Sequence, residues 1–457
     1  MKKISHSLAA YVVASAVCLT PYIAGADTFS TALEKALNKS DKIASVHQSY
    51  LSAREDVSLA KQGLEWTSNV VLDNKRGNKR TNGGDITRND SRNVTLNVKK
   101  KLYDGGVGSA QETVAMINLD IVMQRINMTE QTVLLDAIRA YTGLAQASDR
   151  RDINRANVNR LGEYLKAAQL QLDLGEITPT DFAGTRARHA RAKAGLIQAE
   201  TALASQEANY LAMIGDIPPQ LSLPDVTPAG AYDLPFTAIA AGHKALQYHP
   251  SYLISSLQER VARKTMDVLI AGVRPNLDLT LSSKTTDATS NIMDSVNHSA
   301  TVMLSMPLLP SSSVYSKSRG AVADHREALF AQKDSRRSIR LAAENAFRAY
   351  QSAEAVIEAY QAEYDAAVIF RDGTAQEVQF GEKTLLDQLD AEQDVVTAEL
   401  NLLISKHDRL DALYSLMAAM GILTSDTLGL SGMPSPDAAP PIESPIVAPF
   451  PIIDYPE

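Results

Sequence analysis

The chain is internally duplicated, and two short segments about two hundred residues apart show the duplication most clearly. Residues 175–181 (GEITPTD) and 381–387 (GEKTLLD) share a Gly-Glu pair, a threonine three residues after the glycine and an aspartate six residues after it. Residues 137–141 (AIRAY) recur as residues 346–350 (AFRAY) at nearly the same offset. Several matches in one order predict that the chain contains two copies of one architecture. A solenoid is not predicted, because solenoid proteins repeat at shorter periods of roughly 20 to 50 residues.

Each of the two segments has the pattern of a tip between two antiparallel helices. The glycine, Gly175 or Gly381, is expected to end one long helix, because glycine adopts the left-handed conformation of a helix C-terminus without strain. The threonine is expected to be the N-cap of the next helix, and the aspartate three residues later completes a capping box. The predicted capping pairs are Thr178 with Asp181 and Thr384 with Asp387.

The first 26 residues have the layout of a cleaved secretory signal, with Lys2 and Lys3 followed by an apolar run over residues 8–19. Cys18, the single cysteine, lies inside this segment, so we expect no disulfide or thiolate metal site in the exported chain. Removing the two lysines leaves 43 Lys and Arg against 53 Asp and Glu, a net charge of about −10. This charge argues against nucleic acid as a partner.

Two regions change from helical periodicity to strict alternation, which predicts two β-hairpins. The alternating segments are residues 66–73 and 93–101 in the first copy, and residues 276–282 and 301–308 in the second. A polar loop over residues 75–92, turning at Asn82-Gly83-Gly84, is expected between the first two strands. Strands of about nine to eleven residues with one apolar face are long enough to cross a bilayer when tilted. A half-buried sheet on a soluble core would show the same alternation, but the chain contains no second sheet to cover it.

Four strands cannot close into a barrel, and an open sheet edge in lipid leaves backbone N–H and C=O groups unpaired. We therefore expect a barrel shared between chains. Eight strands from two chains or twelve from three would close it, and the strand spacing does not choose between them. Trp66, Tyr103 and Tyr315 lie at predicted strand ends, where aromatic residues mark a membrane interface.

Hydrophobic residues make up 45% of the chain but aromatic residues only 5%, which favours long helices over compact β domains. Outgoing helical patterns run over residues 107–174 and 314–380, and returning patterns over residues 179–214 and 385–422. No catalytic triplet or metal-ligand spacing is present, and the glycines at 106 and 108 lack the third glycine of a dinucleotide loop. The sequence thus predicts neither an enzyme nor a cofactor.

The predicted boundaries follow the duplication and the distribution of proline. Five prolines lie in a linker, and eight lie in the last 25 residues, which we expect to be extended or disordered. The predicted parts are a signal peptide (1–26), a first repeat (27–216) with a β-hairpin at 65–103 and a tip near 175–181, a linker (217–235), a second repeat (236–430) with a β-hairpin at 275–309 and a tip near 381–390, and a tail (431–457).

Three motifs accompany this plan: residues 102–106 (LYDGG) at a strand exit, residues 274–275 (RP) before the third strand, and residues 380–390 at the second tip. With them, the chain up to about residue 430 resembles the TolC-type outer-membrane efflux and secretion channels. The resemblance implies an α+β membrane protein with a trimeric 12-stranded outer-membrane β-barrel, four strands per chain. The barrel would continue into a long periplasmic α-helical barrel that is closed by the helical tips.

The resemblance also implies roles for individual residues near the tips. Asp387 and Asp390 match aspartates that ring the pore constriction, and Asp390 has no capping role to account for it. Thr180 and Asp181 match residues that hold the tip closed, and Lys383 occupies the basic position expected to contact Asp181 between hairpins or chains. Val378 stands where that closing network has a tyrosine.

Two functional hypotheses follow. The first is a passive conduit of a tripartite efflux pump or a type I secretion system, formed by a homotrimer with a periplasmic adaptor and an inner-membrane RND or ABC transporter. The alternative is a structural or adhesive surface protein whose coiled coil faces outward. The loop 75–92, with six basic and two acidic residues, fits either contact with outer-membrane lipid phosphates or a solvated loop.

Overall fold

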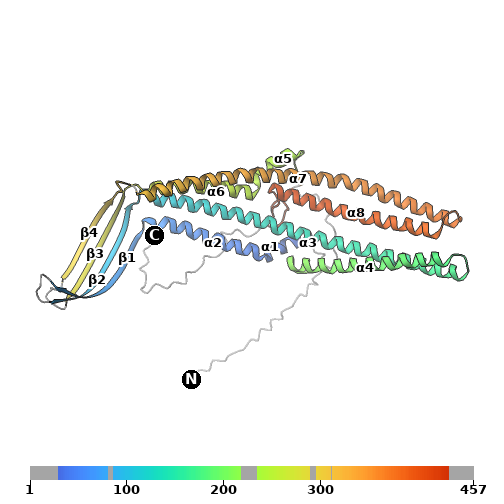
Figure 1. The fold of residues 1–457 in the computed structure, drawn as a ribbon, viewed down its shortest axis with the longest axis horizontal. Coiled ribbons are helices and arrows are strands. Elements are labelled where there is room, and N and C mark those ends of the chain that lie inside the picture. Colours follow the sequence, from blue (N-terminus) through green and yellow to red (C-terminus); the bar gives the residue numbers. More distant parts are fainter. Residues whose placement is uncertain (1–28, 81–85, 218–233, 289–294, 310, 432–457) are drawn as a thin grey trace, which may run out of the picture.

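The computed structural model describes residues 29–80, 86–217, 234–288, 295–309 and 311–431. These residues form an elongated molecule, with a sheet at one end and long helices that extend to the other (Figure 1). The signal peptide at 1–26, the turn at 82–84, most of the linker at 217–235 and nearly all of the tail at 431–457 lie outside the described residues.

Apart from one short 3-10 helix in the first copy, the two copies contain the same elements in the same order. The first copy comprises α1 (Phe29–Lys39), α2 (Asp41–Lys61), the 3-10 helix η1 (Gln62–Leu64), β1 (Trp66–Arg80), β2 (Ile86–Tyr103), α3 (Val107–Asp173) and α4 (Pro179–Met213). The second comprises α5 (Ala238–Tyr248), α6 (Pro250–Ala271), β3 (Asn276–Ala288), β4 (Ser295–Ser305), α7 (Ser312–Gln379) and α8 (Leu385–Met420). None of the described helices has an apolar stretch long enough to span a bilayer.

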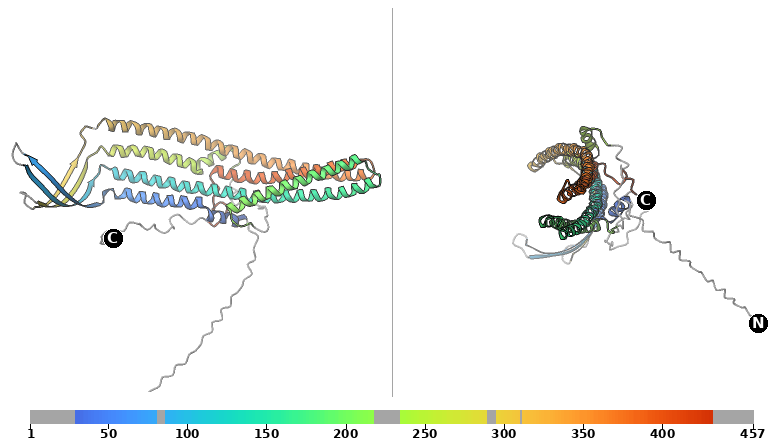
Figure 2. Two further views of the ribbon diagram at one scale, coloured as in Figure 1. Left: turned by 60° about the horizontal axis from the view of Figure 1, so that its bottom comes forward. Right: turned by 90° about the vertical axis from the view of Figure 1, so that its right-hand side faces the viewer.

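The four strands form one antiparallel sheet in the order β1-β2-β3-β4. The β2–β3 pairing joins the two copies, so that β1 and β4 are the edges of the sheet. The helices continue from the sheet, and when viewed along the long axis they lie on an arc (Figure 2). One chain is thus a curved segment with two open strand edges.

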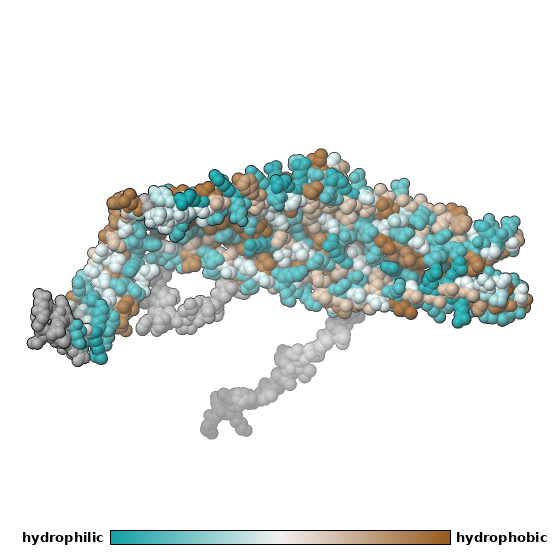
Figure 3. All heavy atoms as spheres, in the orientation of Figure 1, coloured by the Kyte–Doolittle hydropathy of each residue, from teal (hydrophilic) through white to brown (hydrophobic). Residues whose placement is uncertain are grey.

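The first hairpin differs from the expected one. The prediction of a polar loop over residues 75–92 is wrong. Strands β1 and β2 remain paired through this region, from Lys75 opposite Ser91 to Arg80 opposite Ile86. Ladder hydrogen bonds are made by the backbone, so polar side chains do not end a strand even where the apolar alternation stops. The fourth strand also lies earlier in the chain than the expected segment 301–308, since it runs from Ser295 to Ser305. The segment between this strand and α7 exposes apolar side chains (Figure 3). Leu308 and Leu309 there are 80% and 91% exposed.

The largest core cluster lies at mid-length, where the two copies meet. Phe29 of α1 packs edge-on against Tyr141 of α3, with ring centroids 5.2 Å apart, and also contacts Tyr414 of α8. Tyr141 belongs to the first of the duplicated AIRAY and AFRAY segments, and its counterpart Tyr350 packs on a second cluster around Ala343. The repeated tyrosine therefore supports the middle of the molecule in both copies.

Gly421 ends α8 at the closest approach between backbones in this region. Its φ is +77°, and a Cβ atom at this position would lie 2.6 Å from the backbone N of His249. His249 in turn caps α6, since its Nδ1 accepts a hydrogen bond from the Ser251 N–H at 3.2 Å. Only glycine satisfies both the left-handed conformation and the lack of space.

We predict that Gly421→Ala lowers the stability of the assembled protein more than Gly381→Ala does. The two glycines have the same φ of +77°, but a Cβ atom at Gly381 would meet nothing within 4 Å. Both variants should lose about 1 to 2 kcal/mol from backbone strain, and Gly421→Ala about 1 to 3 kcal/mol more from overlap with His249. Thermal dissociation in detergent measures the difference. Equal midpoints for the two variants would contradict the close approach.

Candidate functional site

The two helical tips lie at the end of the molecule that is farthest from the sheet (Figures 1 and 2). A small apolar cluster joins the two hairpins there, and its buried members are Leu161 of α3, Ala192 of α4 and Leu389 of α8. Leu385 and Leu386 at the start of α8 pack against this cluster. The predicted site residues are therefore positioned by α4 and α8, which come from different hairpins.

Both predicted capping boxes are confirmed. At the second tip, the Thr384 hydroxyl oxygen accepts the Asp387 N–H at 3.3 Å, and Asp387 Oδ2 accepts the Thr384 N–H at 2.9 Å. Thr178 and Asp181 repeat this arrangement at the first tip, with distances of 3.2 Å and 3.1 Å. The hydrogen bonds from Thr384 lower the pKa of Asp387, so this exposed group is a carboxylate at neutral pH.

Asp390 takes no part in the capping box, but it has an ion-pair partner that the sequence did not indicate. Arg188 of α4 donates two hydrogen bonds to Asp390 Oδ1, from Nε at 3.1 Å and from Nη2 at 2.6 Å. Sequence reasoning missed this pair because the two residues are about two hundred positions apart. Arg188 also lies among several arginines on α4, and spacing alone does not identify the one that faces α8.

Lys383 and Asp181 are not brought together within the chain. Lys383 Nζ pairs with Glu377 Oε2 at 2.7 Å in its own hairpin and lies over the Phe370 ring. Asp181 is bonded to Thr178, and Thr180 is the exposed second residue of α4. A contact between Lys383 and Asp181 of neighbouring chains remains a prediction.

A buried polar cluster behind the tip was not predicted from the sequence. Glu392 of α8, which is 8% exposed, accepts a hydrogen bond from the Tyr164 hydroxyl at 3.3 Å, and Arg160 Nε lies 3.7 Å from its other oxygen. Gln388 donates a hydrogen bond to the Tyr164 hydroxyl at 3.0 Å. Burial, followed by the charge of Glu392, raises the pKa of Tyr164. Since Gln388 lies between the two site aspartates in sequence, this cluster fixes the rotation of α8 that orients them.

Apolar side chains flank both tip glycines and are exposed. Leu170 and Leu174 before the first glycine are 65% and 74% exposed, and Phe380 before the second is 82% exposed. These side chains are available at the tips for contact with another protein.

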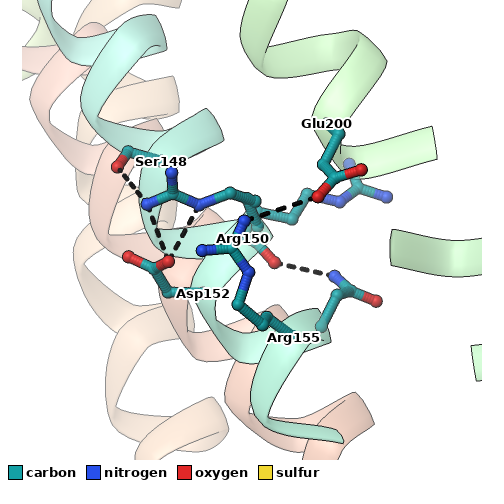
Figure 4. Close-up of polar contacts among 7 residues, drawn as sticks. Ser148, Arg150, Asp152, Arg155 and Glu200 are labelled. Atoms are coloured by element: carbon teal, nitrogen blue, oxygen red, sulfur yellow. Dashed lines mark hydrogen bonds and ion pairs between the residues drawn. The ribbon is translucent and has the colours of Figure 1, made fainter. Parts of the chain in front are cut away.

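Farther from the tip, one ion pair joins α3 to α4 and another lies within α3. Arg155 of α3 lies 3.4 Å from Glu200 of α4, and Arg151 pairs with Asp152 on the same helix (Figure 4). Both pairs are largely solvated, so each contributes only about 0 to 1 kcal/mol. Only the pair of Arg155 with Glu200 joins the two helices of the hairpin.

His407 on α8 is buried, and neither of its ring nitrogens has a hydrogen-bond partner among the described residues. Burial disfavours the charged imidazolium and lowers the pKa of His407 to about 4. We therefore predict that stability falls as the pH drops from about 6.5 to about 4, because over this range only the unfolded chain takes up the proton. The loss should reach about 3 kcal/mol per chain.

Replacing the imidazole by an apolar side chain should reduce this acid sensitivity. We expect the dissociation temperature of His407→Leu to fall less between pH 6.5 and pH 4 than that of the unmodified protein. Part of the slope should remain, because burial also lowers the pKa values of His47, His189 and His249. The control His243→Leu, at an exposed position, should retain the slope of the unmodified protein. Thermal dissociation measured across this pH range gives both slopes. A His407→Leu protein that loses stability as steeply as the control would contradict a neutral buried histidine.

Comparison with known proteins gives a consistent result. A family model described as Outer membrane efflux protein matches residues 32–216 and 241–422. The chain is 27% identical over 434 residues to the outer membrane efflux protein BepC of Brucella suis, covering 94% of this chain and 93% of BepC. It is also 27% identical over 352 residues to the alkaline protease secretion protein AprF of Pseudomonas aeruginosa, covering 75% of this chain and 72% of AprF.

Solved structures share the fold at lower identity. The CmeC outer membrane channel of Campylobacter jejuni matches with a TM-score of 0.73 at 12% identity, covering 86% of this chain and 85% of that one. The outer membrane protein VceC of Vibrio cholerae matches with a TM-score of 0.72 at 14% identity, covering 86% of this chain and 96% of VceC. The arrangement of strands and long helices is thus common to these channels.

Proposed function

The chain belongs to the outer membrane efflux protein family, and we propose that it is the outer-membrane conduit of a tripartite efflux pump or a type I secretion system. Its place in the cell is the outer membrane, with the helices extending into the periplasm. Membership of this family decides against the adhesive surface protein, whose helices would face outward. The relatives include one protein named for efflux and one named for protease secretion, which supports both classes of cargo.

One observation carries the proposal: a four-stranded sheet with two open edges continues into helices that lie on an arc. Copies of the chain can close both the sheet and the arc at once. An eight-stranded barrel from two chains has an interior only wide enough to be filled by side chains. Three chains give twelve strands and a wider lumen, so the functional unit is a homotrimer in contact with outer-membrane lipid.

The narrowest part of the conduit is assigned to the second helical tip. Asp387 and Asp390 lie in the first two turns of α8, and three chains place six carboxylates around the axis. Carboxylates in a narrow aqueous passage favour cations. Asp181, Thr180 and Lys383 are assigned to contacts between neighbouring tips that hold the passage closed.

The exposed leucines and phenylalanine at the tips support docking of a periplasmic adaptor at this end. The adaptor connects the conduit to an inner-membrane transporter of the RND or ABC class, which supplies the energy. The conduit itself performs no catalysis and needs no cofactor. Transport through it is passive.

Site-specific photo-crosslinking in living cells tests the docking end. A crosslinker placed at Leu174 or Phe380 should capture a periplasmic protein that co-purifies with an inner-membrane transporter, because these side chains are exposed at the tips. A crosslinker at Leu59, which is also exposed but lies at the end of α2 that leads into η1 and β1, is the matched control. Capture of the same protein at Leu59 and not at the tips would refute docking at the tips.

Selectivity measurements test the constriction. We expect the double change Asp387→Asn and Asp390→Asn to lower the preference for cations over anions, because it removes two carboxylates per chain from the passage. Reversal potentials across a salt gradient in planar bilayers measure this preference, and native mass measurement first establishes that three chains are assembled. An unchanged reversal potential in the assembled variant would place the constriction elsewhere.

A further inference from the structure

We propose that Arg188 is a selectivity-determining residue that cancels the charge of Asp390, so that Asp387 alone supplies the net negative charge of the constriction. This inference rests on the proposed function, since it concerns the charge that an ion meets at the tip. It assigns different electrostatic roles to two aspartates that the sequence presents as equivalent.

The contact between Arg188 and Asp390 has the geometry of a strong ion pair. Two guanidinium donors, Nε and Nη2, reach the same carboxylate oxygen at 3.1 Å and 2.6 Å. Hydrogen bonds between charged partners are shorter and stronger than those between neutral groups. Because α4 carries the arginine and α8 carries the aspartate, the pair also joins the two hairpins of one chain.

The packing around Arg188 directs its side chain toward α8. Gly184 lies one turn earlier on α4, and a Cβ atom there would be 3.2 Å from Leu386 Cδ2 and 3.5 Å from Arg188 Nη1. The glycine thus leaves room for both the leucine of α8 and the guanidinium. Arg186 and Arg191, on either side of Arg188 in the sequence, are exposed, and among the described residues Arg188 is the arginine of α4 that bonds to α8.

Asp387 has a different environment. Its carboxylate accepts hydrogen bonds from the backbone N–H and the hydroxyl of Thr384, which are neutral groups. Neutral donors stabilise the carboxylate without cancelling its charge. The nearby Lys383 is bonded to Glu377. In this arrangement each chain therefore contributes about one net negative charge to the constriction.

The charge balance gives an unusual expected pattern among three variants. Asp390→Asn leaves an unmatched arginine and should shift selectivity toward anions, whereas Arg188→Gln leaves an unmatched aspartate and should shift it toward cations. The double variant removes both charges and should return to the selectivity of the unmodified channel. In water, one unit charge at about 6 Å changes the local concentration of a monovalent ion about threefold, which sets the expected size of each shift in permeability ratio.

Reversal potentials in a potassium chloride gradient measure the selectivity of these three variants and of the unmodified channel, after assembly is established by native mass measurement. Arg188→Lys, which keeps the positive charge, should stay within about twofold of the unmodified channel and serves as the variant least disturbing to folding. Arg186→Gln, at an exposed position on the same helix, should cause a smaller shift than Arg188→Gln. An equal shift from Arg186→Gln would show an effect of overall charge and overturn the assignment to Arg188.

The outcomes also separate this inference from the proposed constriction. If Asp387→Asn combined with Asp390→Asn shifts selectivity while Arg188→Gln does not, the constriction stands and the role of Arg188 is overturned. If neither the double aspartate change nor Arg188→Gln shifts selectivity, the proposed constriction and the role of Arg188 are both overturned. If the single variants shift in opposite directions and the Arg188→Gln, Asp390→Asn double variant does not, Arg188 sets the charge of the passage.

Discussion

Backbone N–H and C=O groups along the outer edges of β1 and β4 need hydrogen-bond partners that the described residues of one chain do not supply. In water these groups would be solvated, but in lipid each unpaired group costs several kcal/mol. The need to pair these strand edges therefore also determines how the helices assemble. Since the helices continue directly from the strands, the copies that complete the sheet also bring their helices together, and the open arc of one chain becomes part of a tube.

The stabilising contacts within the chain are unevenly distributed along its length. The middle is held by a large aromatic and aliphatic cluster from both copies and by the close approach of Gly421 to His249. The tips are joined by a small apolar cluster, the buried Glu392 network and the ion pair between Arg188 and Asp390. The tips are thus the end of the molecule that rearranges more easily, because regions that move are those with few buried contacts.

Local features of the fold could be predicted from the sequence, and distant pairings could not. The capping boxes at Thr178 and Thr384 depend on residues three positions apart, so spacing alone identifies them. The extent of β1 and β2 was underestimated because alternation reports the side chains, whereas the strands are extended by backbone pairing over Lys75 to Arg80. Arg188 and Glu392 acquire their partners only when two hairpins pack together, and neither one lies in a recognisable motif.

The uninterrupted length of α3 converts small rearrangements in the middle of the molecule into larger displacements at its end. From Tyr141, in the mid-length cluster, the helix continues to Asp173 without a break, a distance of about 48 Å at 1.5 Å per residue. In a rigid helix of this length, a small tilt at one end produces a large displacement at the other. Tilting it by about 5° around the aromatic cluster would move the tip sideways by about 4 Å, which exceeds the length of the hydrogen bonds that join Arg188 to Asp390.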